Sequence, residues 1–434
     1  MTPAHATVPL PSQAPADPLM PAHTRPALVA GGGIGGLAAA LALQQCGFAV
    51  EVFEQAPEIG EIGAGIQLGP NAFSAFDALG IGPQARAKAV YTDDMVMHDA
   101  IDAFEVGRIP TGEAFRARFG NPYAVCHRAD LHLTLYEAVK ALGQVRFHTS
   151  TRIERIEQDA QGVTVIDQRG RRWAGCALIG ADGVKSVVRE QFVGDPARVT
   201  GHVVYRAVVE REDFPVDLRW NSASIWVGPD CHLVHYPLRG GEQYNVVVTF
   251  HSRETEAWGV TDGSREEVMS YFQGICPQAR QLINLPKSWR RWATADREPI
   301  ETWTFGRVTL LGDAAHATTQ YLAQGACMAL EDAVTLAECL RLKGNDLPEA
   351  LKCYEQARVA RTARIVLSAR EMGRIYHAKG VQRYVRNDLW RGRSPERFYD
   401  AVEWLYGWRR DNCLDALGHG GSLAKAQYAS ETNT

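Results

Sequence analysis

A cluster of glycines near the start of the chain has the spacing that dinucleotide binding requires. Gly31, Gly33, Gly35 and Gly36 lie in the stretch AGGGIGG, which contains the pattern G-x-G-x-x-G. In this pattern Gly31 permits a tight turn, Gly33 lets the backbone approach a pyrophosphate, and Gly36 lets the helix and the strand pack closely. The N-terminus of the following helix would offer free N–H groups to the phosphates. The glycines therefore predict a dinucleotide turn, and they leave open whether the ligand is NAD or FAD.

The elements around these glycines complete a βαβ unit. An apolar run at 27–30 precedes them, a small-residue helix is expected at 37–45, and a β-rich run at 49–53 ends in Glu54. Glu54 lies 23 residues after Gly31, where an acid usually accepts the hydroxyls of a ribose. A glycine-rich turn of another kind would rarely have its strand, helix and acid all in place.

Two later turns place polar residues at the ends of expected strands. A buried strand runs into Asp182-Gly183, and a strand at 308–311 stops at Gly312-Asp313. Ligands of α/β proteins bind at such carboxyl ends of strands. Arg128 also follows a short strand and could bind a phosphate. Taken alone, Gly312-Asp313 would be a helix-capping turn and Arg128 a surface cation.

The composition of the chain limits the classes of function. Its 434 residues are 46% hydrophobic, enough for a sizeable core, and the formal net charge of −4 does not favour nucleic acid as a partner. No apolar run approaches the ~20 residues that a membrane span needs. The nine cysteines form no C-x-x-C pair and no compact cluster. We therefore expect reduced thiols, no bound metal and a cytoplasmic location.

Together the three turns resemble those of the single-component flavoprotein aromatic hydroxylases, the family of the para-hydroxybenzoate and salicylate hydroxylases. Their motifs GGGIGG, IGADGVKSVVR and LLGDAAH occur in the expected order, and the similarity covers about residues 27–415. The resemblance implies that the first turn holds the adenosine and pyrophosphate of FAD, with Glu54 on the ribose. Gly312-Asp313 would bind the ribityl chain, and Arg128 would lie near the FAD linker. Asp182-Gly183 would support FAD and contribute to the interaction with the reduced nicotinamide.

The resemblance also implies the fold and its divisions. We expect a mixed α/β protein in which a Rossmann-like FAD-binding domain is interleaved with a mixed-sheet substrate domain and followed by C-terminal helices. Alternating strands separated by turn residues between about 201 and 299 agree with such a second sheet. The expected divisions are a disordered extension (1–25), the FAD-binding domain (26–90, 120–198 and 300–345), the substrate domain (91–119 and 199–299), a C-terminal helical region (346–415) and a flexible tail (416–434).

The chemistry of the family implies an enzyme that uses NADH and dioxygen as co-substrates. NADH would reduce FAD, and dioxygen would then form a flavin hydroperoxide whose outer oxygen attacks an aromatic ring. The family binds the nicotinamide transiently, without a second Rossmann domain, which agrees with the single glycine fingerprint. A homodimer is compatible with this interpretation, because members of the family commonly dimerise.

The segment after GDAAH departs from the commonest pattern of the family. Many members have a proline there and then P-x-x-G-Q-G beside the flavin, whereas this chain has ATTQYLAQGA. This variant places Gln320 near the substrate and Gly325 near the flavin. Together with EIGAGIQLGPNAF and PYAVCHRADLH, it resembles hydroxylases that convert 3-hydroxybenzoate into gentisate by attack para to the hydroxyl. Hydroxylation of salicylate at carbon 1, giving catechol, is the nearest alternative, and another phenolic acid is a further one.

The proposed attack needs a base that removes the proton of the phenol. Histidine is the side chain best matched to this task at neutral pH. Alternation along HLVHY puts His232 and Tyr236 on one face of a strand and His235 on the other. We therefore predict His232 as the base, Gln320 as a partner of the same hydroxyl, and Tyr236 as a substrate contact. A plain strand histidine is the competing interpretation of His232.

Other assignments stay open on the sequence alone. Tyr123 and Arg206 are the candidates for holding the substrate carboxylate, and either could be structural instead. An NAD-dependent dehydrogenase would explain the first turn but neither Asp182-Gly183 nor Gly312-Asp313. A non-catalytic flavin-binding protein would not need the whole set of cofactor turns.

Overall fold

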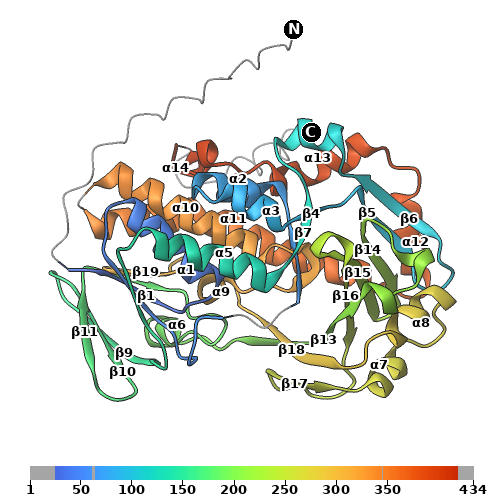
Figure 1. The fold of residues 1–434 in the computed structure, drawn as a ribbon, viewed down its shortest axis with the longest axis horizontal. Helices are drawn as coiled ribbons and strands as arrows, with labels where there is room; N and C mark the ends of the chain where they lie inside the picture. Colours follow the sequence, from blue (N-terminus) through green and yellow to red (C-terminus); the bar gives the residue numbers. More distant parts are fainter. Residues whose placement is uncertain (1–24, 61–63, 345, 419–434) are drawn as a thin grey trace, which may run out of the picture.

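The computed structural model describes residues 25–60, 64–344 and 346–418 (Figure 1). The expected N-terminal extension therefore lies outside the described residues except for Arg25, and so does the part of the expected tail from 419 to 434. The last helix, α14, covers Asp415–Gly418. Helical structure thus continues three residues beyond the predicted start of the tail.

A six-stranded sheet organises the first half of the molecule. All neighbouring strands in it run parallel except β19 and β20. Every residue of its two central strands, β1 and β12, is buried, as expected for a parallel sheet that is covered on both faces. In order, the strands are β19 (Thr304–Phe305), β20 (Val308–Leu310), β12 (Ala177–Gly180), β1 (Ala27–Ala30), β2 (Val50–Phe53) and β8 (Val145–His148).

Helices cover this sheet on one side, and a small antiparallel sheet adjoins it. The first helix, α1, begins at Ile34, three residues earlier than predicted, because the two glycines that follow Ile34 already belong to its first turn. Figure 1 shows α1, α5 and α10 side by side above the strands. The covering helices are α1 (Ile34–Gln45), α2 (Pro70–Ala78), α3 (Gly82–Lys88), α5 (Arg128–Ala141) and α10 (Gly325–Lys343); the small sheet has β9 (Ile153–Gln158), β10 (Val163–Asp167) and β11 (Arg172–Gly175), followed by α6 (Val187–Phe192).

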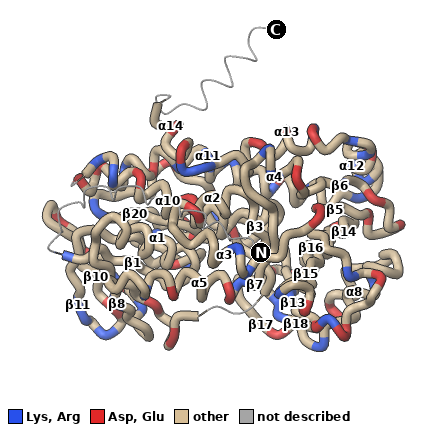
Figure 2. Tube along the Cα trace, turned by 45° about the horizontal axis from the view of Figure 1, so that its top comes forward, with Lys and Arg blue, Asp and Glu red and all other residues tan. Residues whose placement is uncertain are grey.

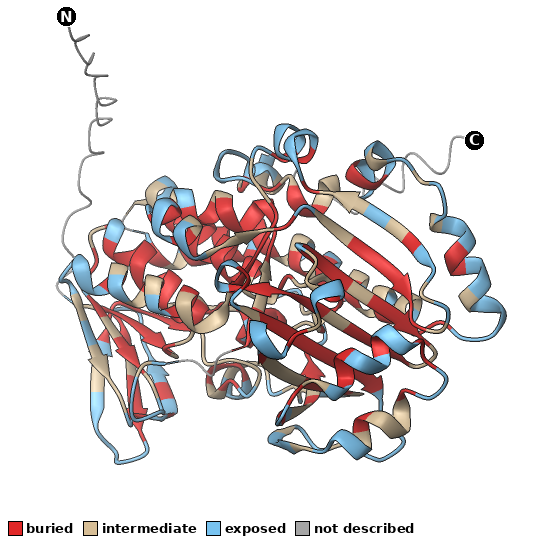
Figure 3. Cartoon of the chain, turned by 45° about the vertical axis from the view of Figure 1, so that its right-hand side comes forward, coloured by how far each residue is buried: buried red, intermediate tan, exposed pale blue. Residues whose placement is uncertain are grey.

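An eight-stranded mixed sheet forms the second half. Strands β5 and β6 come from residues 94–110, yet they complete one edge of this sheet because β5 pairs in parallel with β14. In Figure 3 its central strands are largely buried, whereas exposed residues concentrate on the peripheral loops and helices. In order, the strands are β17 (Gly259–Gly263), β18 (Trp289–Asp296), β13 (Arg198–Glu210), β16 (Gln243–His251), β15 (Cys231–Leu238), β14 (Ser222–Gly228), β5 (Asp94–Asp99) and β6 (Glu105–Pro110).

Shorter elements connect the two halves and flank them. A three-stranded sheet has the order β3-β7-β4. Helices α7 and α8 belong to the second half, and α11 packs along α10 before the chain reaches α12 and α13 (Figure 1). These elements are β3 (Gly65–Leu68), β7 (Ala124–His127), β4 (Val90–Tyr91), α4 (Glu113–Phe119), α7 (Arg265–Tyr271), α8 (Pro277–Asn284), α9 (Asp313–His316), α11 (Leu347–Tyr376), α12 (Val381–Trp390) and α13 (Pro395–Tyr406).

The predicted fold class is confirmed. The protein has a Rossmann-like parallel unit, a mixed sheet and C-terminal helices, while the residue boundaries between domains stay a prediction. Figure 2 shows acidic and basic residues interspersed along the described trace. None of the described helices is long and apolar enough to cross a membrane.

A buried cluster of charges joins α10 to α11. Arg358 donates to Glu331 at 2.8 Å and to Asp332 at 2.6 Å, and all three side chains are fully buried. Asp332 also accepts a hydrogen bond from the backbone N–H of Gly312 at 3.0 Å. Burial acts to raise the pKa of Asp332, but His316 and Arg358 outweigh it and lower the pKa to about 2. The cluster therefore ties both helices to the turn that follows β20.

We expect Arg358→Met to lower the free energy of unfolding by about 3–5 kcal/mol, because it leaves two carboxylates buried without this cation. Because the pKa of Asp332 is depressed, its share of the stability should be complete at neutral pH and should disappear as the pH falls from about 4 to 2. Arg374→Met, on the exposed side of the same helix, should cost less than about 1 kcal/mol. Denaturant titration followed by circular dichroism measures both, and equal losses would contradict the role of the cluster.

Candidate active site

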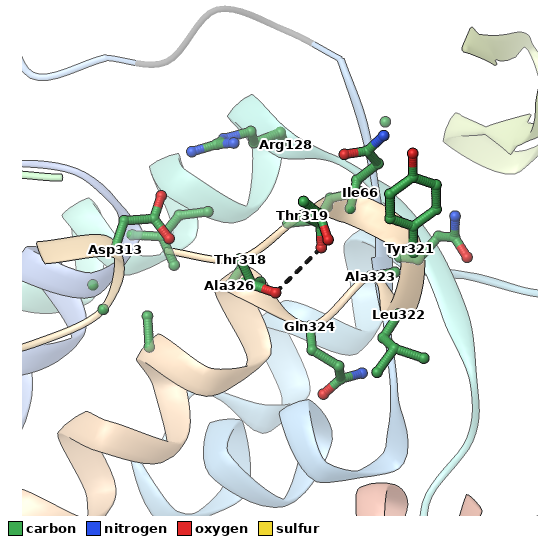
Figure 4. A pocket seen from close by; sticks show the side chains of 18 of the residues that line it. Ile66, Arg128, Asp313, Thr318, Thr319, Tyr321, Leu322, Ala323, Gln324 and Ala326 are labelled. Carbon is green, nitrogen blue, oxygen red and sulfur yellow. Dashed lines mark hydrogen bonds between the residues drawn. The ribbon is translucent and has the colours of Figure 1, made fainter. Parts of the chain in front are cut away.

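A cavity of about 980 Å³ lies between the two large sheets. Its wall includes the glycine turn after β1, the turns after β12 and β20, and one face of β15. Figure 4 shows Arg128 and Asp313 at this cavity together with the segment from Thr318 to Ala326. The structure thus brings the three predicted cofactor turns and the predicted substrate strand to one space, with a volume typical of a cofactor cleft.

The glycine turn has no room for side chains at two positions. Gly31 has a φ of +103°, and a Cβ atom there would overlap the carbonyl oxygen of Ala181 at the end of β12. A Cβ atom on Gly36 would overlap the carbonyl oxygen of Gly31, so this glycine packs the helix against the turn rather than mainly against the strand. Gly33 precedes the first residue of α1 and lines the cavity, which leaves the helix N-terminus open to a phosphate.

Gly35 has a packing role that the sequence does not reveal. A Cβ atom on it would lie 3.1 Å from the Leu311 side chain and 3.3 Å from the Ala329 side chain. Leu311 follows β20, and Ala329 belongs to α10. Gly35 therefore lets α1 approach both elements that carry the third cofactor turn.

Glu54 is held at the edge of the glycine turn. Its two carboxylate oxygens accept hydrogen bonds from the backbone N–H groups of Gly32 at 2.8 Å and of Ala56 at 2.7 Å. The side chain lines the cavity, and each oxygen keeps a lone pair for another donor. This arrangement suits a carboxylate that accepts ribose hydroxyls.

Asp182 offers an unsatisfied oxygen. One carboxylate oxygen accepts from the backbone N–H of Val187 at 2.8 Å, while the other is buried without a hydrogen-bond partner among the described residues. Burial raises the pKa of Asp182. Because buried polar atoms are normally hydrogen-bonded, this oxygen indicates a ligand at the cavity. Gly183, next to it, has a φ of +77° and also lines the cavity.

The third turn presents Asp313 to the cavity. Gly312 has a φ of +62°, and Asp313 begins the short helix α9 (Figure 4). Gly325 lies at the start of α10, close enough that a Cβ atom on it would be 3.9 Å from an oxygen of Asp313. The predicted residues Asp313, Gly325 and Arg128 therefore line one cavity with the glycine turn.

His232 occupies the opposite part of the cavity wall. It is 2% exposed, and its Nδ1 lies 2.8 Å from Nε2 of His377 in a hydrogen bond. Burial, and then the charge of His202, lower the pKa of His232 to about 3, so the ring is a neutral base at physiological pH. Gln320 donates to the hydroxyl of Thr249 at 3.3 Å, and Thr249 is the register partner of His232 on the neighbouring strand.

The predicted facing of β15 agrees with the structure. His232, Val234 and Tyr236 line the cavity, whereas His235 is buried on the other face and accepts a hydrogen bond from Nε1 of Trp226 at 3.3 Å. His235 is therefore a core residue of the sheet.

The remaining predicted substrate contacts also line the cavity. Tyr123 donates its hydroxyl proton to the side chain of Gln67. Arg206 lies with its guanidinium 5.7 Å from the ring centroid of Trp292, and burial lowers its pKa. No ion pair of Arg206 occurs among the described residues, so it is a half-buried cation with capacity for an anion.

The sequence prediction missed several residues at the site. His377 bonds to the predicted base, and the Tyr321 ring contacts His232 with 5.4 Å between the ring centroids. Tyr376 adds another ring at 5.7 Å from His232. Tyr321 directly follows Gln320 in the segment ATTQYLAQGA, so the sequence motif could have identified it. Nothing in the spacing of the chain connects residue 377 to strand β15.

The cradle without Cβ atoms, the helix N-terminus and the unsatisfied oxygen of Asp182 fit FAD, and they define a dinucleotide-binding protein. Residues 24–369 match the family described as FAD binding domain. The chain therefore belongs to this family of FAD-dependent aromatic-ring monooxygenases, with FAD as its cofactor, as the sequence predicted.

Particular relatives sharpen this assignment. The chain is 77% identical over 389 residues to 3-hydroxybenzoate 6-hydroxylase of Polaromonas naphthalenivorans, covering 90% of this chain and 97% of that protein. Among solved structures, HpxO of Klebsiella pneumoniae in complex with FAD and uric acid superposes with a TM-score of 0.77 at 28% identity, covering 90% and 97% of the two chains. A salicylate hydroxylase in a substrate complex has a TM-score of 0.75 at 26% identity, with the same coverage.

We expect Gly31→Ala to abolish FAD binding, because the new Cβ atom overlaps Ala181 and the backbone has a positive φ. Gly112→Ala is a matched control, since no atom lies within 4 Å of its added Cβ and its φ is −74°. Flavin absorbance of the purified proteins, at about 450 nm, measures the bound cofactor. Retention of FAD by Gly31→Ala would refute this account of the turn.

Proposed function

We propose that the protein hydroxylates 3-hydroxybenzoate at the carbon para to its hydroxyl, using NADH and dioxygen, and that the product is gentisate. The observation that carries the proposal is the convergence of His232 and Gln320 on one wall of the FAD cavity. The 77% identity to a 3-hydroxybenzoate 6-hydroxylase supports this choice of substrate.

The chemistry requires an electron-rich ring in a protected cavity. Bound FAD, once reduced, supplies activated oxygen from dioxygen. A phenol has a pKa near 10, so a base must take its proton at neutral pH. Nδ1 of His232 is engaged by His377, and the other nitrogen, Nε2, is available to accept that proton. The resulting phenolate directs attack to its para carbon, which is carbon 6 of 3-hydroxybenzoate.

Arg206 is our choice for the substrate carboxylate. It is a cation at the cavity wall without an ion pair among the described residues, whereas the hydroxyl of Tyr123 is already engaged with Gln67. Tyr236 lies on the same strand face as His232 and packs against Gly65, where a Cβ atom would approach its hydroxyl oxygen to 2.6 Å. Tyr236 would thus orient the ring between the base and the flavin.

Salicylate is the second candidate substrate. The structural similarity to a salicylate hydroxylase favours it, at a lower identity of 26%. Two further parts of the proposal rest on what is common in the family. The reductant is NADH rather than NADPH, and the protein forms a homodimer. A cytoplasmic location is also proposed, and it agrees with nine cysteines that are all buried and free of disulfides.

We expect the FAD-loaded enzyme to convert 3-hydroxybenzoate into gentisate while oxidising NADH. Chromatography of the products from 3-hydroxybenzoate and from salicylate measures the preference. Catechol from salicylate without gentisate from 3-hydroxybenzoate would overturn the choice of substrate. NADH oxidation that no phenolic acid stimulates would overturn the monooxygenase activity itself.

We expect His232→Ala to lower the rate of hydroxylation by about a hundredfold to ten-thousandfold, because the phenol loses its base. NADH binding should change little. His235→Ala is the control on the opposite face: it should reduce stability but retain turnover per bound FAD. Steady-state kinetics normalised to flavin content compares them, and equal turnover in the two variants would refute the assignment.

A further inference from the structure

The FAD cavity meets the protein surface at two ends. At one end the exposed residues Gln55 and Lys185 line it, next to Glu54 and Gly183 of the cofactor turns. At the other end Ala401 of α13 lines the cavity and is exposed. The cofactor turns assign the first end to FAD, so the second end is left for a small substrate.

The second end, which we call the outer arm, lies between one edge of the mixed sheet and the C-terminal helices. Figure 1 shows α12 and α13 beside β5 and β6 at this edge. A Cβ atom on Gly107 of β6 would lie 3.1 Å from the Phe398 ring, so α13 packs directly on the strand. The residues that line the outer arm are Met97, Gly107, Trp390, Arg393, Phe398 and Ala401. Arg393 is the one charged residue of this set.

Helix α12 is fixed to the sheet by a buried carboxylate. Asp99, the last residue of β5, is 0% exposed. It accepts hydrogen bonds from Arg383 at 2.7 Å and from Arg386 and Asn387 at 2.8 Å each, and all three donors belong to α12. Because a buried carboxylate must keep its partners, these bonds hold the end of α12, and with it Arg393, at the outer arm.

The outer arm leads to the predicted base. Trp390 and Tyr376 pack against one apolar cluster on the sheet, which consists of Met97, Val106 and Val227. Tyr376 also lines the cavity, and its ring centroid lies 5.7 Å from that of His232. Apolar and aromatic surface therefore continues from the neighbourhood of Arg393 to His232, and an aromatic ring can move along it.

Arg393 is suited to attract a carboxylate to this passage. Its guanidinium carbon lies 5.3 Å from the ring centroid of Phe398, and the residue is half-buried. No ion pair of Arg393 occurs in the part of the chain that the structure describes. A guanidinium binds a carboxylate through two parallel N–H donors, and a positive charge at the mouth of a cleft raises the rate at which anions arrive. The cation and the aromatic walls together match an aromatic acid.

We propose that the outer arm is the entrance for the aromatic acid, and that Arg393 attracts the carboxylate before the ring passes to His232. The inference rests on the proposed function, in which the substrate is a hydroxybenzoate anion. Inside the cavity the carboxylate ends at Arg206, the cation that we assign to it. Arg393 thus acts on the rate of binding and takes no part in the chemical step.

The first test measures binding of 3-hydroxybenzoate to the FAD-loaded full chain by stopped-flow mixing, followed by the change in flavin absorbance. We expect Arg393→Gln to lower the association rate constant by at least about fivefold at low salt, and the difference from wild type should shrink as the ionic strength rises. Arg393→Lys keeps the charge and should retain most of the rate.

Arg391→Gln is the matched control for this test. Arg391 lies two residues earlier, is exposed and has its guanidinium carbon 4.8 Å from the Phe104 ring centroid, but it does not line the cavity. Its removal takes the same charge from the same connection between α12 and α13. Association at the wild-type rate is therefore expected for this variant.

The second test narrows the mouth of the outer arm with Ala401→Trp, at an exposed position of α13 where the fold tolerates a large side chain. A narrower passage slows entrance and exit alike, so the association and dissociation rate constants should fall by the same factor and Kd should stay unchanged. Ala117→Trp, on an exposed position of α4 outside the cavity, should change neither.

Wild-type binding kinetics in either Arg393→Gln or Ala401→Trp would overturn the entrance. Wild-type enzyme that neither binds nor hydroxylates 3-hydroxybenzoate would overturn the proposed function instead.

Discussion

The buried carboxylate of Asp332 is the constraint on which the flavin half of the cavity depends. It accepts hydrogen bonds from Arg358, His316 and the backbone of Gly312, so one side chain joins two long helices to the turn that presents Asp313. A charge in the core is tolerated only when it is fully paired, and pairing of this kind permits one geometry. Paired charges beneath it therefore hold the turn at Gly312-Asp313 in one geometry. The glycine turn beside it is held in a different way, because its close backbone contacts leave no room for Cβ atoms.

The substrate half is held by a different kind of interaction. His232, Val234 and Tyr236 stand on a strand whose neighbours on both sides are paired in register, so backbone hydrogen bonds determine their directions. The C-terminal end of α11 then brings His377 to the back of His232. A rigid sheet on one side and a turn held by paired charges on the other can keep His232 and the turn at Asp313 at a constant separation.

The sequence predicted those parts of the site whose signal is local. The glycine turn, Glu54, Asp182-Gly183 and Gly312-Asp313 each stand at the end of a strand and line the cavity, and there composition and spacing are enough to predict the element and its place. The period of two in β15 was sufficient to separate His232 from His235. Contacts that join distant elements, such as that of His377 with His232, follow from tertiary packing and have no counterpart in the spacing of the chain. The start of α1 was displaced because glycines are poor helix formers in isolation, yet the first turn of α1 requires them: Gly35 lies against Leu311 and Ala329, and Gly36 lies against the carbonyl of Gly31.

The pairing of β5 with β14 has a consequence for how the protein is made. The register joins Asp94 to Ser222, 128 residues later in the chain (222 − 94). At the usual speed of a ribosome, roughly ten seconds pass between the synthesis of these two strands. During this interval the edge of β5 has no partner, although its first hairpin with β6 can already form. Nascent chains of this protein thus expose a strand edge to aggregation, and long-range sheet closure would set the pace of their maturation.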